Sequence, residues 1–299
     1  MNLFLKRIAY FFLFILLVYP TYLIILGFLA PVLPNLNYRQ MSYGHMHTRI
    51  QETKNRRDVD ILFLGSSQAY RGFDVRKFEN SFNLGSSSQT PIQTELLLNR
   101  YLDSLNPKTI VYAVDQSIFS SDGVESSVDI IANDKNDLKS LKMAFNVNHL
   151  KTYNTLLFGY VHDLSFRKTS LKEPPQKEKD TYVAGGYVER EMEYFKSYVN
   201  YPPSQWSLDR QQIKAFKNIL SMTDTRNIRL ILVYVPITTA LYQSFTDNEL
   251  FDTKMKSYGE YHNFNPIVPL DDSLHFYDSH HLNQTGTELF NDYLMEFLK

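Results

Sequence analysis

Two short segments, far apart in the sequence, carry side chains suited to nucleophilic chemistry. The tripeptide Gly-Ser-Ser, residues 65–67, follows the apolar run of residues 59–64, and Asp278 and His281 lie three positions apart before a predicted C-terminal helix. A serine hydroxyl becomes reactive when a histidine takes its proton, and a carboxylate orients that histidine and stabilises the imidazolium. The segments therefore predict a serine–histidine–aspartate site. The alternatives are an ordinary turn for the first segment and a solvated loop for the second.

A second predicted strand ends in the same way as the first. Residues 81–84 lead into Gly85, which two further serines follow. A glycine at that point lets the backbone approach a ligand closely, and open α/β sheets bind ligands at the carboxyl ends of their strands. The alternative is again a simple turn.

The C-terminal segment is also rich in residues that bind metals. Three histidines and three aspartates fall between residues 271 and 281, namely Asp271, Asp272, His275, Asp278, His280 and His281. Such side chains bind zinc or manganese, but their spacing is not the helical HExxH spacing of zinc enzymes. We therefore favour the base-and-acid interpretation and predict no metal and no cofactor. We also expect His280 to point elsewhere if His281 points into the site.

The apolar pattern predicts the elements that must position these residues. Near-continuous apolar runs indicate strands, and runs with helical spacing indicate helices between them. We expect strands at residues 59–64, 81–84, 109–114, 229–237 and 266–270, and helices at residues 91–105, 209–222 and 286–298. This alternation predicts an α/β fold, a three-layer sandwich with a mostly parallel sheet.

Residues 117–206 interrupt the alternation and contain no clear strand. They include a charged, proline-bearing run (171–180) and a glycine-rich tract (184–186), followed by Tyr187, Tyr194, Phe195, Tyr198, Tyr201 and Trp206. One interpretation is an exposed insertion whose aromatic side chains pack back onto the core. The other is a cap over the site, with aromatic rings that stack on a sugar or an acyl chain.

The N-terminal segment is long and apolar, since residues 8–34 carry no charge. About 20 apolar residues span a bilayer, whereas the apolar core of a cleaved signal peptide, the alternative, has about 7–15. We therefore predict a transmembrane anchor over residues 1–34, a juxtamembrane linker over 35–57 and an α/β domain over 58–299. A long domain translocates largely regardless of charge, so we expect this domain on the periplasmic or extracellular side of the cytoplasmic (inner) membrane.

The composition excludes several functional classes. The 299 residues include no cysteine, which excludes disulfide scaffolds, cysteine nucleophiles, iron–sulfur clusters and thiolate zinc sites. The 31 basic and 32 acidic residues give a net charge of -1, which argues against a dedicated nucleic-acid binder. Serine is therefore the natural nucleophile, and a neutral ester or glycan suits the chain better than a polyanion.

Three blocks, taken in order, carry a family resemblance. Gly-Ser-Ser at 65–67, Asn-x-Gly at 83–85 and Asp-x-x-His at 278–281 follow one another, and the last block continues as His-Leu-Asn-x-x-Gly. This pattern resembles the SGNH (GDSL-like) hydrolase superfamily, which implies an SGNH/flavodoxin-like sheet. The Gly-Ser-Ser variant is similar to the branch that contains the teichoic-acid D-alanine transfer protein and the alginate O-acetylation proteins. The resemblance covers residues 58–116 and 209–299.

The resemblance implies a role for each matching residue. Ser67 would be the nucleophile, His281 the base and Asp278 the acid. The N–H groups of Ser67 and Gly85 would bind the oxyanion.

Two positions depart from the family's pattern. Ser66 replaces the usual aspartate of Gly-Asp-Ser, and Asp115 and Gln116 stand where the third block supplies an asparagine to the oxyanion. An ionised Asp115 would repel an oxyanion, whereas the Gln116 amide has a hydrogen to donate.

The resemblance also implies a function. Anchored Gly-Ser-Ser members of this superfamily often work beside a membrane-bound O-acyltransferase and help to O-acylate a surface polysaccharide. We therefore expect a bacterial cell-envelope serine acyltransferase or esterase whose substrate is an envelope polysaccharide or an acyl ester. Two alternatives stay open. One is a plain carbohydrate esterase or deacetylase with water as acceptor, and the other is a non-catalytic glycan-binding or assembly protein with a degenerate SGNH fold.

Overall fold

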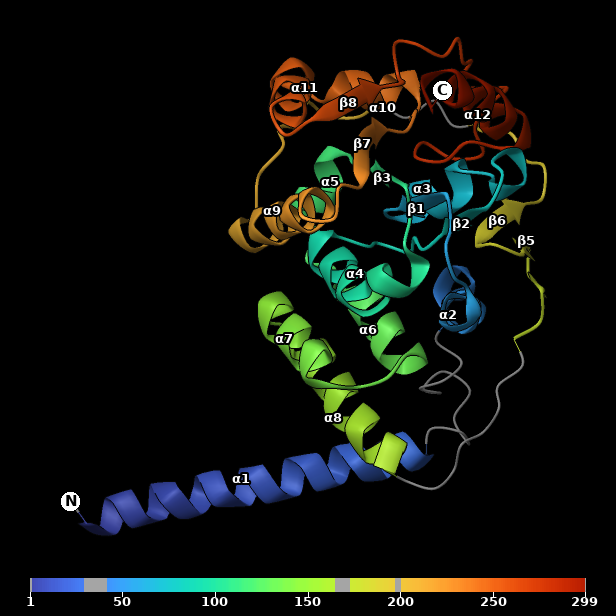
Figure 1. The fold of residues 1–299 in the computed structure, drawn as a ribbon. Coiled ribbons are helices and arrows are strands. Elements are labelled where there is room, and N and C mark those ends of the chain that lie inside the picture. Colours follow the sequence, from blue (N-terminus) through green and yellow to red (C-terminus); the bar gives the residue numbers. More distant parts are fainter. Residues whose placement is uncertain (1, 30–41, 165–172, 197–199, 299) are drawn as a thin grey trace.

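A parallel sheet lies at the centre of the fold (Figure 1). The computed structural model describes residues 2–29, 42–164, 173–196 and 200–298. Five strands pair in the order β2-β1-β3-β7-β8, and every pairing is parallel. They are β1 (Ile61–Leu64), β2 (Ser81–Asn83), β3 (Thr109–Ala113), β7 (Arg229–Tyr234) and β8 (Glu260–Asn263). The protein is therefore an α/β protein, as the apolar runs predicted.

Helices make up most of the remaining described chain. Those that join or flank the sheet are α3 (Ser67–Gly72), η3 (Val75–Lys77), α4 (Pro91–Leu105), α9 (Arg210–Asp224), α10 (Thr239–Ser244), α11 (Asn248–Lys256) and α12 (Gln284–Leu298). The segment between β3 and β7 contains α5 (Gln116–Ser120), α6 (Val124–Asn133), α7 (Leu138–Val147) and α8 (Leu150–Leu164). The N-terminal region contains α1 (Asn2–Leu29), η2 (Tyr43–His45) and α2 (Met46–Asn55).

Consecutive side chains of the central strands enter two separate apolar cores. Leu62 and Tyr112 belong to one core, together with α4 and α9. Phe63 and Val111 belong to the other, together with α3 and α12. Because successive side chains of a strand point to opposite faces, both faces of β1 and β3 are buried, which explains their near-continuous apolar sequences.

One predicted strand is wrong. Residues 266–270 were expected to form the fifth strand, but the edge position is taken by β8, which pairs with β7 from Ile231 opposite Glu260. Pro266 and Pro269 have no N–H to donate to a ladder, which disfavours a strand there.

The segment 117–206 also differs from the prediction, because it contains strands. β4 (Gln176–Lys177), β5 (Asp180–Val183) and β6 (Tyr187–Arg190) form a separate antiparallel sheet. Gly185 and Gly186 turn the chain between β5 and β6 with φ of 98° and 102°, a conformation that glycine adopts readily. A pair of glycines between two short strands is a hairpin signal, and the surrounding charged residues obscured it.

The helix α1 is long and apolar enough to cross a membrane. Its segment Leu3–Leu29 has a mean hydropathy of 2.4, and by this test a signal sequence would qualify as well. It lies at the opposite end of the molecule from α12 and passes α8 (Figure 1). There the Tyr19 hydroxyl donates to Oδ1 of Asn154 at 2.8 Å, and the rings of Phe28 and Phe158 meet edge to face at 5.4 Å.

The predicted linker of residues 35–57 is part of the folded body from residue 42 onward. It forms η2 and α2 there, and Met46 and Ile50 are buried in the same core as β1 and α4. The folded body therefore begins before residue 58, the start that the sequence suggested. Residues 30–41 lie outside the described chain.

Arg49 joins α2 to the rest of the body. Its fully buried guanidinium donates 2.8 Å hydrogen bonds to the carbonyls of Gly44 and Gly186. It also lies over the rings of Tyr70 at 5.1 Å and Tyr182 at 5.7 Å. One side chain thus connects α2, α3 and the β5–β6 hairpin.

We expect Arg49→Ala to lower the free energy of unfolding by about 3 kcal/mol, since two buried carbonyls lose their donor and two rings lose a cation. Chemical unfolding of the full chain in detergent micelles measures the change. Arg57→Ala is the matched control, because Arg57 is exposed and donates only to nearby carbonyls of its own segment. Equal stability of the two variants would contradict the role given to Arg49.

Candidate active site

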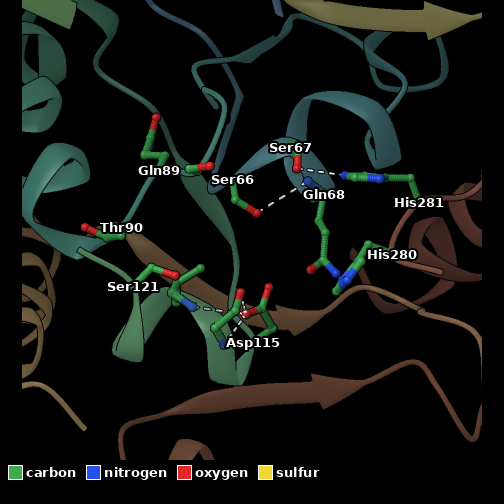
Figure 2. Close-up of a pocket in the computed structure, with 12 residues that line it drawn as sticks. Ser66, Ser67, Gln68, Gln89, Thr90, Asp115, Ser121, His280 and His281 are labelled. Atoms are coloured by element: carbon green, nitrogen blue, oxygen red, sulfur yellow. Dashed lines mark hydrogen bonds between the residues drawn. The ribbon is translucent and has the colours of Figure 1, made fainter. Parts of the chain in front are cut away.

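A pocket lies at the carboxyl ends of β1 and β3. The chain leaves β1 for β2 on one side and β3 for β7 on the other, and such a switch point is where open parallel sheets bind ligands. Ser67 follows β1 and Asp115 follows β3, and both line this pocket of about 120 Å³ (Figure 2).

The turn that presents Ser67 requires glycine. Gly65 has a φ of 137°, and a Cβ there would lie 2.8 Å from the Cβ of Ala113. Directly after this turn, Ser66 caps α3 by accepting the N–H of Gln68. Ser67 is therefore held as the first residue of a helix, with its hydroxyl at the pocket.

Three residues predicted to act together are in direct contact. Oγ of Ser67 lies 2.7 Å from Nε2 of His281, and Nδ1 of His281 lies 2.9 Å from both carboxylate oxygens of Asp278. A carboxylate beside Nδ1 stabilises the Nδ1–H tautomer, which leaves Nε2 free to accept the hydroxyl proton. The arrangement can therefore activate the serine.

Asp278 is suited to hold the imidazolium that such a step creates. Burial raises the pKa of its carboxyl, but hydrogen bonding to the His281 ring, the charge of that ring and the backbone N–H groups of His280 and His281 outweigh it. The pKa of Asp278 therefore lies below its ordinary value, and the carboxylate stays ionised at neutral pH.

Two residues expected to bind an oxyanion have other partners, so these two expectations are corrected. The N–H of Gly85 donates to Oδ1 of Asn83 at 3.0 Å. Nε2 of Gln116 donates to Oδ1 of Asn248, in α11, at 2.9 Å. Neither Gly85 nor Gln116 lines the pocket. Ser67 is the first residue of α3, and the first N–H of a helix has no acceptor within that helix. The N–H of Ser67 is therefore the expected oxyanion donor that is left beside the nucleophile.

Asp115, His280 and Gln68 form a polar wall of the pocket (Figure 2). The Asp115 carboxylate lines it as expected and also caps α5, accepting two backbone N–H groups. Oε1 of Gln68 is buried and has no hydrogen-bond partner within the described chain, so a ligand hydroxyl or amide would satisfy it.

His280 lines the same pocket as His281, contrary to expectation. The two residues share a turn in which Oδ1 of Asp278 accepts both of their backbone N–H groups, so they do not alternate as strand residues would. His280 is exposed at the rim, but partial loss of hydration beside the pocket lowers its pKa, and the charge of His281 lowers it further.

Sequence reasoning missed several polar residues of the pocket. They are Gln68, Ser88, Gln89, Thr90, Ser117, Ser121 and His280. Most of them follow the carboxyl ends of β1, β2 and β3, so their place after predicted strands was the signal that could have found them.

The residues weighed as metal ligands have local roles. Asp271 accepts the backbone N–H of Ser273 at 2.8 Å, and its own N–H donates to Nδ1 of His275 at 2.8 Å. Asp272 accepts the N–H of Thr239 at 2.8 Å. Within the described ranges, no group of three or more His, Asp or Glu residues is placed to hold a metal ion.

The aromatic residues that the structure describes in the segment 187–206 do not line the pocket. Tyr187 and Phe195 pack with the core of α3 and α12, and Tyr201 and Trp206 pack with the other core. Tyr198 lies outside the described residues. Tyr194 is exposed. The other described rings support the interpretation that the insertion packs back onto the core.

A stack of aromatic and charged groups packs against one face of the His281 ring. Tyr277 lies parallel to it, with the ring centroids 5.4 Å apart and the planes at 4°. The guanidinium groups of Arg71 and Arg190 lie over Tyr277 at 5.7 Å and 4.8 Å. Asp180 binds Arg71 through two hydrogen bonds of 2.9 Å and 2.7 Å, and Arg190 through one of 3.3 Å. The β5–β6 hairpin thereby supports the position of His281.

A scan of the chain against protein-family models found no match, and a search of curated proteins found none either.

We expect Tyr277→Ala to slow the reaction of Ser67 with a fluorophosphonate by roughly 10- to 100-fold, because the imidazole loses the ring that fixes its orientation. Tyr277→Phe keeps the stacked ring and is the matched control, which should react at nearly the wild-type rate. The rate of covalent labelling, followed by mass spectrometry, measures both. Equal rates for the two variants would rule out a positioning role for the ring.

Proposed function

We propose that this chain is a membrane-anchored, serine-dependent acyltransferase or esterase that takes part in O-acylation of a cell-envelope polysaccharide. The observation that carries the proposal is the unbroken path of hydrogen bonds from Oγ of Ser67 through His281 to Asp278. Its components come from the two ends of the α/β body, and they meet where such sheets bind ligands.

The proposed reaction has two acyl-transfer steps. Oγ of Ser67 attacks the carbonyl carbon of an ester while its proton passes to Nε2 of His281. The bond from that carbon to the leaving oxygen breaks, and His281 returns the proton to the leaving group. In the second step a hydroxyl of a sugar or of water gives its proton to His281 and attacks the acyl-serine, which releases the new ester or acid and restores Ser67.

The composition of the pocket supports a short acyl group, such as acetyl. Its volume is about 120 Å³, and Ile118 is the one aliphatic side chain among its lining residues. A long acyl chain would bury its apolar surface against polar side chains that then lose hydrogen bonds to water. A small, polar ester avoids that cost.

The sequence blocks support a place within the SGNH-like superfamily. With that assignment we propose that the two apolar cores and the sheet between them form a three-layer sandwich. We further propose that α1 anchors the chain in the cytoplasmic membrane with the body outside, where a membrane-bound O-acyltransferase is the expected partner.

The openness of the pocket favours one alternative. Ser117, Ser121 and His280 are exposed at its rim, and a wet site favours water as the acceptor. A carbohydrate esterase or deacetylase is therefore the second candidate. The third candidate is a non-catalytic, glycan-binding protein. It is supported by the N–H of Gly85, which donates to Asn83 and is therefore not free to bind an oxyanion.

Ser67→Ala should abolish fluorophosphonate labelling and lower hydrolysis of p-nitrophenyl acetate by roughly 10⁴-fold or more, because the nucleophile is removed. Ser88→Ala is the matched control, since Ser88 lines the same pocket but bonds to Glu125 rather than to His281. Equal labelling of wild type and Ser67→Ala, or no labelling of either, would refute the triad.

Transfer and hydrolysis differ in the fate of the acyl group. We expect the full chain in detergent, given p-nitrophenyl acetate and a mixture of cellohexaose, maltohexaose and N-acetylchitohexaose, to form an acetylated oligosaccharide as well as acetate. Mass spectrometry of the sugars measures the transfer. Acetate without any acetylated sugar would favour the esterase.

A further inference from the structure

A second, larger pocket shares one lining residue with the Ser67 pocket. Its volume is about 430 Å³, and Ser121 lines both pockets. Its walls come from the α5–α6 turn, the end of α7 and the start of α9. This volume falls within the roughly 300–1,000 Å³ of typical ligand sites, whereas the Ser67 pocket, at about 120 Å³, lies below that range.

The junction of the two pockets is held by a buried amide. Gln212, at 2% exposure, donates from Nε2 to the carbonyl of Ser121 at 3.0 Å and accepts the N–H of Ile92 on Oε1 at 3.3 Å. Asp209 donates its backbone N–H to the carbonyl of Phe119 at 2.9 Å. These bonds fix α4, α5 and α9 relative to one another, so the position of Ser121 between the two pockets is part of the folded framework.

The groups that line this second pocket suit a sugar chain. Phe145 is 62% exposed, and the ring of Tyr153 supports it edge to face at 5.8 Å. The neighbouring Asn146 lines the pocket, and no hydrogen bond of its side-chain amide is found within the described chain. Ser120 and Gln211 add an exposed hydroxyl and an exposed amide. The Ser120 hydroxyl donates to the carbonyls of Gln116 and Ser117 and keeps its lone pairs as acceptors. An exposed ring beside such amides and a hydroxyl acceptor can contact both the C–H face and the hydroxyls of a pyranose.

The charge of the second pocket selects against anionic chains. Its two carboxylates, Asp122 and Asp209, cap the starts of α6 and α9, and none of its lining residues is Lys or Arg. An anionic glycan would therefore meet two like charges and no counter-charge. A neutral chain meets no such penalty.

We propose that the second pocket is an acceptor subsite that binds a neutral oligosaccharide and leads one of its hydroxyls past Ser121 to Ser67. The binding of the chain stands on the second pocket alone, and the delivery of a hydroxyl to an acyl-serine rests on the proposed function. The acceptor hydroxyl loses its proton to His281 and gains the acyl group from Ser67, as in the second step described above.

Isothermal titration of the full chain in detergent tests the binding. The neutral probes are cellohexaose, maltohexaose and N-acetylchitohexaose, and the anionic probe is hexagalacturonate. We expect at least one neutral hexasaccharide to bind, with equal affinity for wild type and Ser67→Ala, and to bind more tightly than hexagalacturonate.

Two variants and one control locate the site. Phe145→Ala and Asn146→Ala should each weaken binding of that hexasaccharide at least fivefold. Leu150→Ala, an exposed position that does not line the second pocket, should leave the affinity unchanged. Phe145 is largely exposed, and thermal unfolding checks that each variant is folded.

The possible failures are distinguishable. Absence of binding by all three neutral hexasaccharides, tighter binding of hexagalacturonate, or equal affinities for Phe145→Ala, Asn146→Ala and Leu150→Ala would overturn the subsite, and labelling of Ser67 would still support the acyl chemistry. Conversely, weakened binding by Phe145→Ala in a chain whose Ser67 is not labelled would support the subsite and refute the enzyme.

Discussion

One contact imposes the strictest constraint on this fold: Oγ of Ser67 and Nε2 of His281, which are 214 residues apart in the sequence, meet at 2.7 Å. A contact of this length requires α3 and the loop before α12 to be fixed relative to each other. The Asn291 side chain on α12 donates to the carbonyl of Gly72, at the end of α3, at 2.7 Å, and the ring of Phe290 packs against Phe73 at 5.8 Å. The apolar core that α3 and α12 share on one face of the sheet therefore does more than stabilise the chain, since it sets the distance between Ser67 and His281 on which the proposed serine chemistry depends.

The sequence predicted those parts of the molecule whose causes are local. The apolar runs of β1, β3 and β7, the helical spacing of α4 and α9, and the glycine at residue 65 all follow from short-range patterns. The residues at strand ends could be assembled into one site because parallel strands place their carboxyl ends at one edge. The two corrected residues differ in origin. Gln116 bonds to Asn248, 132 residues away, and no sequence pattern specifies that contact. Gly85 donates to Asn83, two residues before it, in a local Asx-type turn that the prediction overlooked.

The engagement of Gly85 has a direct consequence for catalysis. Asn83 accepts its N–H at 3.0 Å, and Nδ2 of Asn83 donates to the carbonyl of Ala69 in α3 at 2.8 Å. The same side chain therefore stabilises the helix that carries Ser67 and occupies a donor that the SGNH-like reaction would use. A site that lacks one of its oxyanion donors loses roughly 10²–10³ in rate. The two bonds use different atoms of the Asn83 amide, Oδ1 towards Gly85 and Nδ2 towards α3. The contact that holds Gly85 is therefore part of the same support that holds α3, and the N–H of Ser67 is the donor left beside the nucleophile.

The length of α1 bears on where the body stands if this helix spans a bilayer. The 27 residues from Leu3 to Leu29 would measure about 40 Å at 1.5 Å per residue, whereas the hydrocarbon core is about 30 Å thick. About a quarter of the helix therefore extends beyond the hydrocarbon. Gly27 and Phe28, near the C-terminal end of α1, lie against Phe158 of α8, and Tyr19, ten residues before that end, bonds to Asn154. Under this condition α8, which runs along the C-terminal part of α1 from Tyr19 to Phe28, is the element of the body next to the membrane. The helical segment between β3 and β7 would then serve as the spacer that sets the height of the Ser67 pocket above the bilayer.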